Sequence, residues 1–142
     1  MTVQSSRRLA VLGAASSIGI RPYDGEIEAQ HLDLSDAFAT GTPVEMTAAA
    51  ALDRLAHSGL AGFWIHVDAD VLEPSVMPAV DSPEPGGPNI EELTALVRQL
   101  ARHPRALGMQ ITIYDPALDP EQDCARRLVA LLASSLGEGA PA

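Results

Sequence analysis

The order of apolar patterns along the chain is the feature that most constrains its fold. Short apolar runs typical of buried strands occur at residues 8–13, 29–34, 62–67 and 106–113. Apolar residues recur at helical spacing over residues 47–58, 89–103 and 119–136. Strands that alternate with helices form parallel sheets, because each parallel connection needs a crossover. We therefore expect an α/β fold, with one parallel sheet and helices packed on it.

Residues at the ends of the helical patterns predict the helix boundaries. Thr47 is the expected N-cap of the first helix, which ends at Gly59. Asn89, with Glu92 three residues later, has the spacing of a capping box. Asp119 is the expected N-cap of the last helix, since a proline follows at the first helical position. The apolar face of that helix is expected to consist of Leu128, Leu131, Leu132 and Leu136.

The charge of the chain limits the partners that it can bind. Nineteen acidic residues stand against nine basic ones, which gives a net charge of −10 and a pI near 4.6. This charge repels nucleic acid and anionic membrane, so we expect neither as a partner. All nine basic residues are Arg, which excludes Schiff-base chemistry and a P-loop lysine. Cations, including metal ions, remain possible partners.

Cysteine content and hydropathy bear on the compartment. The one cysteine, Cys124, cannot form an internal disulfide. No apolar run reaches the length of a membrane span, and the polar N-terminal residues are not followed by a secretory signal pattern. These features lead us to expect a cytoplasmic protein.

Two aspartates end the segment with the strongest strand pattern. Residues 62–67 are rich in aromatic and β-branched side chains, and Phe63 and Trp64 are expected in the core. Asp68 and Asp70 follow and, on an extended backbone, would point to the same side. Carboxylates at the end of a parallel strand can share a divalent ion such as Mn²⁺ or Mg²⁺. They can equally stabilise a strand-to-loop turn.

A proline-rich segment follows the aspartates. Five prolines lie between residues 74 and 88, so no helix or central strand is expected there. Long loops in compact domains are usually functional. Glu84 lies in this loop and is a candidate to face the site, although a solvated loop carboxylate is the favoured interpretation.

The stretch from His66 to Gly87 closely resembles the second aspartate motif of the arginase (ureohydrolase) family. In that motif an aspartate pair at a strand end precedes two prolines, a small residue and a glycine at fixed offsets. The matching residues are Asp68, Asp70, Pro74, Pro78, Ala79 and Gly87. The resemblance is good over residues 62–136 and weak over the first sixty. It implies that residues 1–142 form a single partial domain, the C-terminal half of an arginase-like three-layer α/β/α fold with helices on both faces of the parallel sheet.

The resemblance implies a metal-dependent hydrolase. Asp68 and Asp70 would be ligands of a binuclear Mn²⁺ centre, in which two ions acidify a bridging water. The resulting hydroxide would attack the carbon of a small-molecule amidine or guanidine and break a C–N bond in this linear substrate. The family segments that carry the other metal ligands have no counterpart here. We therefore expect a homo-oligomer or a complementing N-terminal half as partner.

Three positions depart from the family pattern. His66 stands where Ser or Thr is usual, and it shares a strand face with Asp68, so a role behind the metal ligands is expected. Ile113 replaces a glutamate that holds the substrate guanidinium, which argues against arginine as the substrate. Gln110 replaces a common Asp. With Glu84, His66 and Ile113 are the candidates to line the substrate pocket.

Two other interpretations remain at this stage. The chain could be a catalytically inactive, truncated arginase-like fold that binds metal or acts as an interaction module, because two carboxylates alone cannot hold two metal ions in an open geometry. A dinucleotide-binding loop at residues 13–19, with Asp33 as the ribose-binding acid, is disfavoured because the glycine spacing differs from the common fingerprint.

Overall fold

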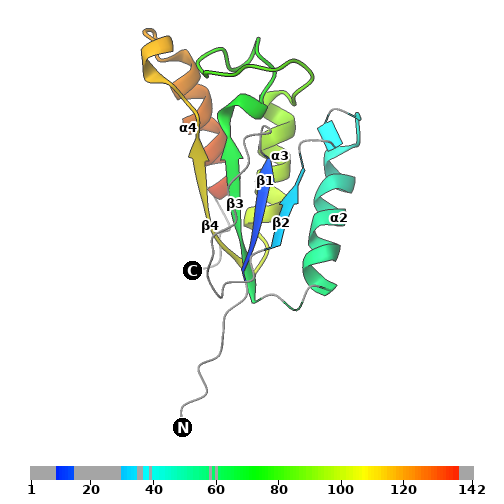
Figure 1. Ribbon diagram of the computed structural model, residues 1–142. Coiled ribbons are helices and arrows are strands. Elements are labelled where there is room, and N and C mark those ends of the chain that lie inside the picture. The colour runs from blue at the N-terminus through cyan, green and yellow to red at the C-terminus, as the bar shows by residue number, and fades with distance from the viewer. Residues whose placement is uncertain are drawn as a thin grey trace, which may run out of the picture.

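The computed structural model describes residues 9–14, 30–34, 37–38, 40–57, 59 and 61–137, and in 9–14 and 30–31 it describes the backbone. Four strands form one sheet, in which each neighbouring pair is parallel (Figure 1). In spatial order they are β2 (Gln30–Asp33), β1 (Leu9–Ala14), β3 (Gly62–Asp68) and β4 (Ala106–Thr112). The parallel sheet predicted from these segments is confirmed. Most of the glycine-rich stretch at 13–19 lies outside the described residues.

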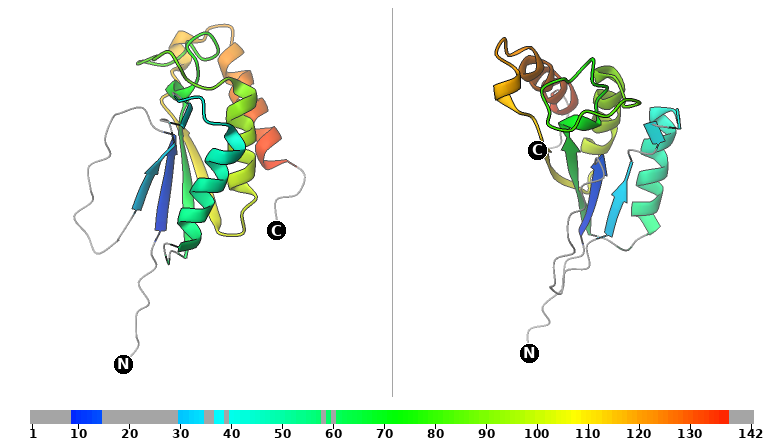
Figure 2. Two further views of the ribbon diagram at one scale, coloured as in Figure 1. Left: turned by 90° about the vertical axis from the view of Figure 1, so that its right-hand side faces the viewer. Right: turned by 45° about the horizontal axis from the view of Figure 1, so that its top comes forward.

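Three helices form one layer against one face of the sheet (Figure 2). They are α2 (Val44–His57), α3 (Ile90–Ala101) and α4 (Asp123–Leu136). The central helix, α3, contacts β3, β4 and both other helices. The resemblance also implies helices on the opposite face, and none is found there among the described residues. Among the described helices, none has the length and apolar character needed to span a bilayer.

The core lies between β3 and the helices. Phe63, Ile65 and Val67 are at most 3% exposed and lie on one face, because alternate strand residues point the same way. The apolar stripe of α3 packs in the same cluster: Leu93, Leu96, Val97 and Leu100. Burying one such side chain contributes about 1.5–3 kcal/mol. The prediction that Trp64 is a core residue is wrong, since it lies on the opposite face and is 38% exposed.

Local side-chain contacts determine where two of the helices begin. Asn89 and Glu92 form the predicted capping box, in which each side chain accepts the backbone N–H of the other at 2.9 Å. The predicted N-cap at Thr47 is wrong, because α2 begins at Val44 and Thr47 lies in its first turn. The Thr47 hydroxyl donates to the Pro43 carbonyl at 3.3 Å, a bond that a threonine inside a helix can form.

The last helix also differs from its prediction. Its N-cap is Gln122, whose φ is 59°, so Asp119 is not the N-cap. The Asp119 carboxylate still accepts two N–H groups of the first turn of α4. Leu136 is 44% exposed, and Ser135 occupies the buried position instead.

The proline-rich loop is closed at its base by hydrogen bonds and close packing. A carboxylate oxygen of Glu73 accepts the Gly86 N–H at 2.9 Å, and the Glu73 N–H donates to the Pro88 carbonyl at 3.0 Å. Gly87 has no room for a side chain, since a Cβ atom would lie 2.9 Å from the Glu73 nitrogen. The motif glycine is therefore required by close backbone packing.

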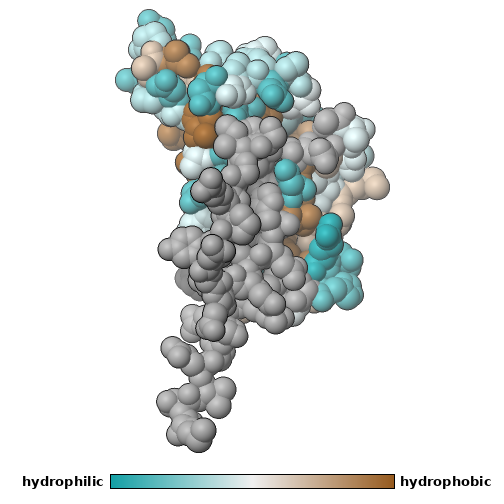
Figure 3. Space-filling model, in the orientation of Figure 1, coloured by the Kyte–Doolittle hydropathy of each residue, from teal (hydrophilic) through white to brown (hydrophobic). Residues whose placement is uncertain are grey.

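The rest of the loop connects this base to the end of β4. As predicted, no helix or strand runs through residues 74–88, although Val80 makes an isolated bridge to Tyr114. The exposed tip, residues 81–86, carries a mainly hydrophilic surface (Figure 3).

Candidate functional site

The two motif aspartates lie at the carboxyl end of β3, below the proline-rich loop (Figure 1). Asp68 is the last residue of β3 and is 8% exposed. Asp70 lies in the 3-10 helix η1 (Ala69–Val71) and is 2% exposed. The expectation that an extended backbone aligns the two side chains is wrong, because the strand ends at Asp68. Both carboxylates are nevertheless withdrawn from water at the edge where parallel sheets bind ligands.

Neighbouring side chains hold the Asp68 carboxylate on one oxygen. His66 Nε2 lies 3.0 Å from Asp68 Oδ1. The Thr112 hydroxyl donates a hydrogen bond to the same oxygen. In the register of β3 and β4, Asp68 stands opposite Thr112, so the sheet itself brings the two together.

His66 also contacts the neighbouring strand. Its Nδ1 lies 2.5 Å from Gln110 Nε2, and the two residues are register partners. The sequence predicts that His66 acts behind the aspartates, and the structure places it in contact with Asp68. The roles of Gln110 and Thr112 escaped prediction, because only the pairing of β3 with β4 reveals them.

A second polar cluster lies just beyond β4. The Tyr114 hydroxyl donates to Asp119 Oδ2 at 2.9 Å, and the Asp119 carboxylate also accepts the N–H groups of Cys124 and Ala125. Burial alone would raise the pKa of Asp119, but these hydrogen bonds outweigh it and lower that pKa. Burial and the bond to Asp119 raise the pKa of Tyr114. This cluster connects the turn after β4 to the start of α4.

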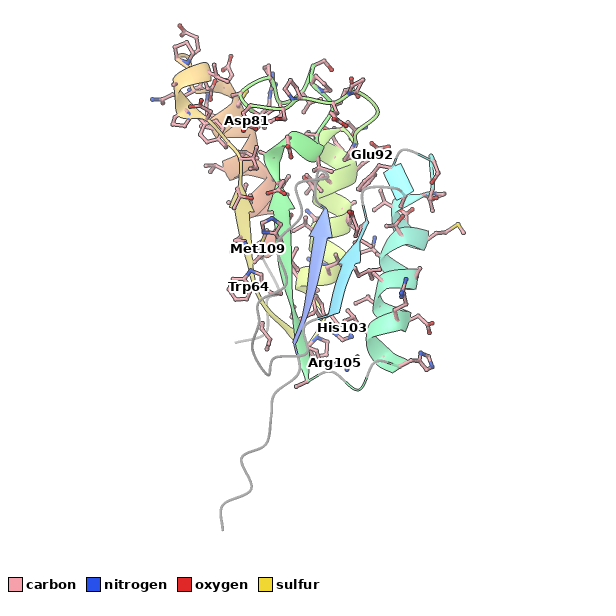
Figure 4. The ribbon with its side chains drawn as sticks, in the orientation of Figure 1. Trp64, Asp81, Glu92, His103, Arg105 and Met109 are labelled. Atoms are coloured by element: carbon pink, nitrogen blue, oxygen red, sulfur yellow. The ribbon has the colours of Figure 1, made fainter. Side chains whose placement is uncertain are left out.

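The other candidate residues lie apart from the aspartates or face elsewhere. Glu84 is exposed on the loop tip. Ile113 packs against the hydrophobic core and has a φ of 71°, in the left-handed region. Asp81 lies on the loop above the sheet, whereas His103 and Arg105 lie at the opposite end of the strands (Figure 4). Burial and the nearby Arg105 lower the pKa of His103.

The described side chains at this edge include groups of the kind that bind metal ions. Carboxylate oxygens and imidazole nitrogens are ligands that suit Mn²⁺. Within the described ranges, however, no three or more His, Cys, Asp or Glu side chains are grouped so that they could hold a metal ion. Asp68 and Asp70 therefore fit the chemistry of such a site without completing it.

The chain is similar to arginases and formimidoylglutamases. The family profile described as "Arginase family" matches residues 7–137, which extends the match well beyond the motif region. Formimidoylglutamase of Bacillus subtilis (strain 168) is 34% identical over 73 residues, which is 51% of this chain and 23% of that protein. The chain thus matches about a quarter of the length of this relative.

Solved structures agree with the sequence match. Arginase from Bacillus subtilis superposes with a TM-score of 0.66 at 25% identity, covering 90% of this chain and 44% of that one. Trypanosoma cruzi formiminoglutamase, in a crystal structure with Mn²⁺, gives a TM-score of 0.58 at 21% identity and covers 77% of this chain and 35% of that one. The fold expected from the motif is confirmed, and by this profile match the chain belongs to the arginase family.

Proposed function

We propose that the chain contributes to a metal-dependent hydrolase that cleaves C–N bonds in linear amidines. The proposal is supported chiefly by one observation: two buried carboxylates, Asp68 and Asp70, lie at the carboxyl end of β3 in a chain of the arginase family. These two side chains would be Mn²⁺ ligands, as the presence of Mn²⁺ in the Trypanosoma cruzi relative suggests. A bound ion would supply an acidified water for attack on the amidine carbon.

The chain's own residues would hold and orient the ligands. His66 and Thr112 hold one oxygen of Asp68. Because both aspartates are shielded from water, their electrostatic attraction for a cation is stronger than it would be in bulk solvent. The remaining metal ligands would come from outside the described side chains, for example from a second copy of the chain or from a complementing polypeptide. Small molecules would enter at the carboxyl edge of the sheet, beside the loop at 74–88.

The substrate is expected to be an amidine rather than arginine. Ile113 is apolar and packs on the core, so it cannot form an ion pair with a guanidinium group. A formimidoyl group, which the name of the Bacillus subtilis relative contains, is an amidine of the expected kind.

A second candidate function is a catalytically inactive family member that binds metal or acts as an interaction module. It is favoured by the lack of a complete ligand set among the described side chains. The two candidates differ in whether bound metal is accompanied by substrate turnover.

Metal binding and activity should be measured on the same samples. We expect wild-type chain to retain Mn²⁺ in equilibrium dialysis, and expect Asp68→Asn and Asp70→Asn each to weaken the affinity at least tenfold, because each removes a charged ligand. Asp53→Asn is a matched control, since Asp53 is exposed on α2. Release of formamide from formimidoyl compounds and of urea from guanidino compounds then tests hydrolysis.

The outcomes separate the interpretations. Equal Mn²⁺ affinity in wild type and Asp68→Asn would contradict the metal role. Binding without product release, in the presence of each substrate class, would favour the inactive module. Sedimentation of the same samples reports whether metal-loaded chains associate.

A further inference from the structure

We infer that Gln110 is a positioning residue that fixes the tautomer of His66 and, through it, the Asp68 carboxylate. The inference rests on the proposed function only in one respect, namely that Asp68 binds a metal ion. The hydrogen-bonded chain itself runs from Gln110 through His66 to Asp68 and is independent of that purpose.

The chemistry of the two neighbours of His66 selects one tautomer. In the amide orientation of the structure, the Gln110 nitrogen lies 2.5 Å from His66 Nδ1 and can only donate, so Nδ1 accepts. A neutral imidazole that accepts at Nδ1 carries its proton on Nε2. Nε2 lies 3.0 Å from Asp68 Oδ1, and an ionised carboxylate can only accept. Both neighbours therefore require the Nε2–H form.

The sheet keeps these groups in place. His66 stands opposite Gln110 in the parallel register, and Asp68 stands opposite Thr112, so the backbone pairing fixes both spacings. His66 is 8% exposed, which leaves its ring little room to turn. The imidazole thus transmits the orientation imposed by the Gln110 amide to the aspartate.

The arrangement leaves one side of the Asp68 carboxylate for another group. Both His66 and Thr112 contact Oδ1. No hydrogen bond among the described residues is made to Oδ2. Partners that orient a metal ligand in this way typically change metal affinity 10–100-fold. Gln110 lies on a neighbouring strand and is not itself a ligand. Through His66 it therefore sets the orientation in which the Asp68 carboxylate would bind a cation.

The tautomer can be read directly by nitrogen-15 NMR. Long-range proton–nitrogen correlation spectra of wild-type chain should show His66 protonated on Nε2, with its resonances assigned from their absence in His66→Gln. Gln110→Met keeps the side-chain length but removes the donor, so the Nδ1 resonance should shift. Gln99→Met, the same change on α3, should leave it in place.

Metal affinity provides the second measurement. Gln110→Met should weaken Mn²⁺ binding about tenfold, while Gln99→Met should match wild type. Wild-type His66 protonated on Nδ1, or on both nitrogens, would overturn the inference even if a variant failed to fold. The inference would also be overturned if Gln110→Met left the Nδ1 resonance unchanged. The same holds if wild type binds Mn²⁺ and Gln110→Met binds it equally well. A wild type that binds no Mn²⁺ would instead contradict the proposed function, and the spectra would still decide the tautomer.

Discussion

At the scale of single residues, Ile113 has an unusual backbone for a β-branched residue. Its φ of 71° lies in the left-handed region, where a β-branched side chain is strained. Contacts on its C-terminal side hold it there, since the Asp115 N–H donates to the Ala79 carbonyl at 2.9 Å and Tyr114 bridges to Val80. Strain of this kind persists where the surroundings over-determine the backbone. Here the strained residue directly follows β4, at the point where the chain bonds to the loop above the aspartates.

The strain at Ile113 predicts that glycine there is more stable than alanine, the reverse of the order expected in an ordinary strand. Ile113→Ala and Ile113→Gly both lose the apolar contacts, but only glycine tolerates the left-handed backbone. We expect Ile113→Gly to be more stable than Ile113→Ala by about 1 kcal/mol in urea denaturation. At Leu107, an extended and exposed β4 residue, the glycine variant should be the less stable one by roughly 0.5–1 kcal/mol. The same order at both positions would contradict a strained Ile113.

The cluster around Asp119 predicts a dependence of stability on pH. The pKa of Asp119 is lowered in the folded chain, so its ionised form stabilises the fold at neutral pH. That stabilisation is present above about pH 4 and is lost as the pH falls through the lowered pKa. We expect Asp119→Asn to be less stable than wild type at pH 7, and the difference to shrink in acid. Urea titrations of both proteins at several pH values should show this trend.

Residue identity predicted the site only in part. Asp68 and Asp70 were recognisable because their spacing to the following prolines and Gly87 matches a known motif. Asp70 turned out to follow the strand rather than extend it. The partners of His66 could not be predicted, because Gln110 is 44 residues away in the sequence and becomes a neighbour only through strand pairing.

At the scale of elements, the pairing of β3 with β4 depends on a glycine beneath an indole ring. A Cβ atom on Gly108 would lie 2.7 Å from Trp64 Cη2, so the ring occupies the space that a side chain would need. Trp64 is also 38% exposed. The glycine therefore lets the indole lie close to the neighbouring strand.

This contact predicts a fluorescence change. Trp64 is the single tryptophan of the chain, so its emission reports on this face alone. We expect Gly108→Ala to displace the ring toward water, to shift the emission to longer wavelength and to cost about 1–3 kcal/mol. In a Trp64→Leu background the same alanine should cost less, because the smaller side chain can move aside. Equal costs in both backgrounds would show that the indole is not the obstacle.

Elements with strong patterns were predicted correctly, and their ends were less so. The strand at 62–68 and the helix at 90–101 have clear apolar periodicity and capping residues, and both formed as expected. The predicted caps at Thr47 and Asp119 failed, since each side chain bonds to the backbone in a way that sequence spacing alone does not distinguish from an N-cap. The prediction that Trp64 lies in the core failed because a strand with a continuous apolar run gives no sequence signal that distinguishes its two faces.

At the scale of the whole molecule, net charge and apolar exposure act in opposite directions. The chain carries a net charge of −10, and β4, the last strand of the described sheet, exposes Leu107 to 56%. Like charges oppose association of two copies, while an exposed apolar edge strand favours it. The balance between them depends on ionic strength.

We expect self-association of the chain to increase with salt. Raising NaCl from about 0.1 M to 1 M shortens the screening length from roughly 10 Å to 3 Å and so weakens the repulsion. Analytical ultracentrifugation should therefore detect a larger dimer fraction at high salt, and Leu107→Glu should reduce it. A monomer at all salt concentrations would contradict association through this edge.

The closed base of the proline-rich loop has a thermodynamic consequence for any molecule that binds above the aspartates. Prolines restrict the unfolded states of this stretch, and the contacts of Glu73 with Gly86 and Pro88 complete its ordering. The loop would already have lost its conformational entropy during folding, before a small molecule binds. Its affinity would therefore not be diminished by the need to immobilise the polypeptide around it.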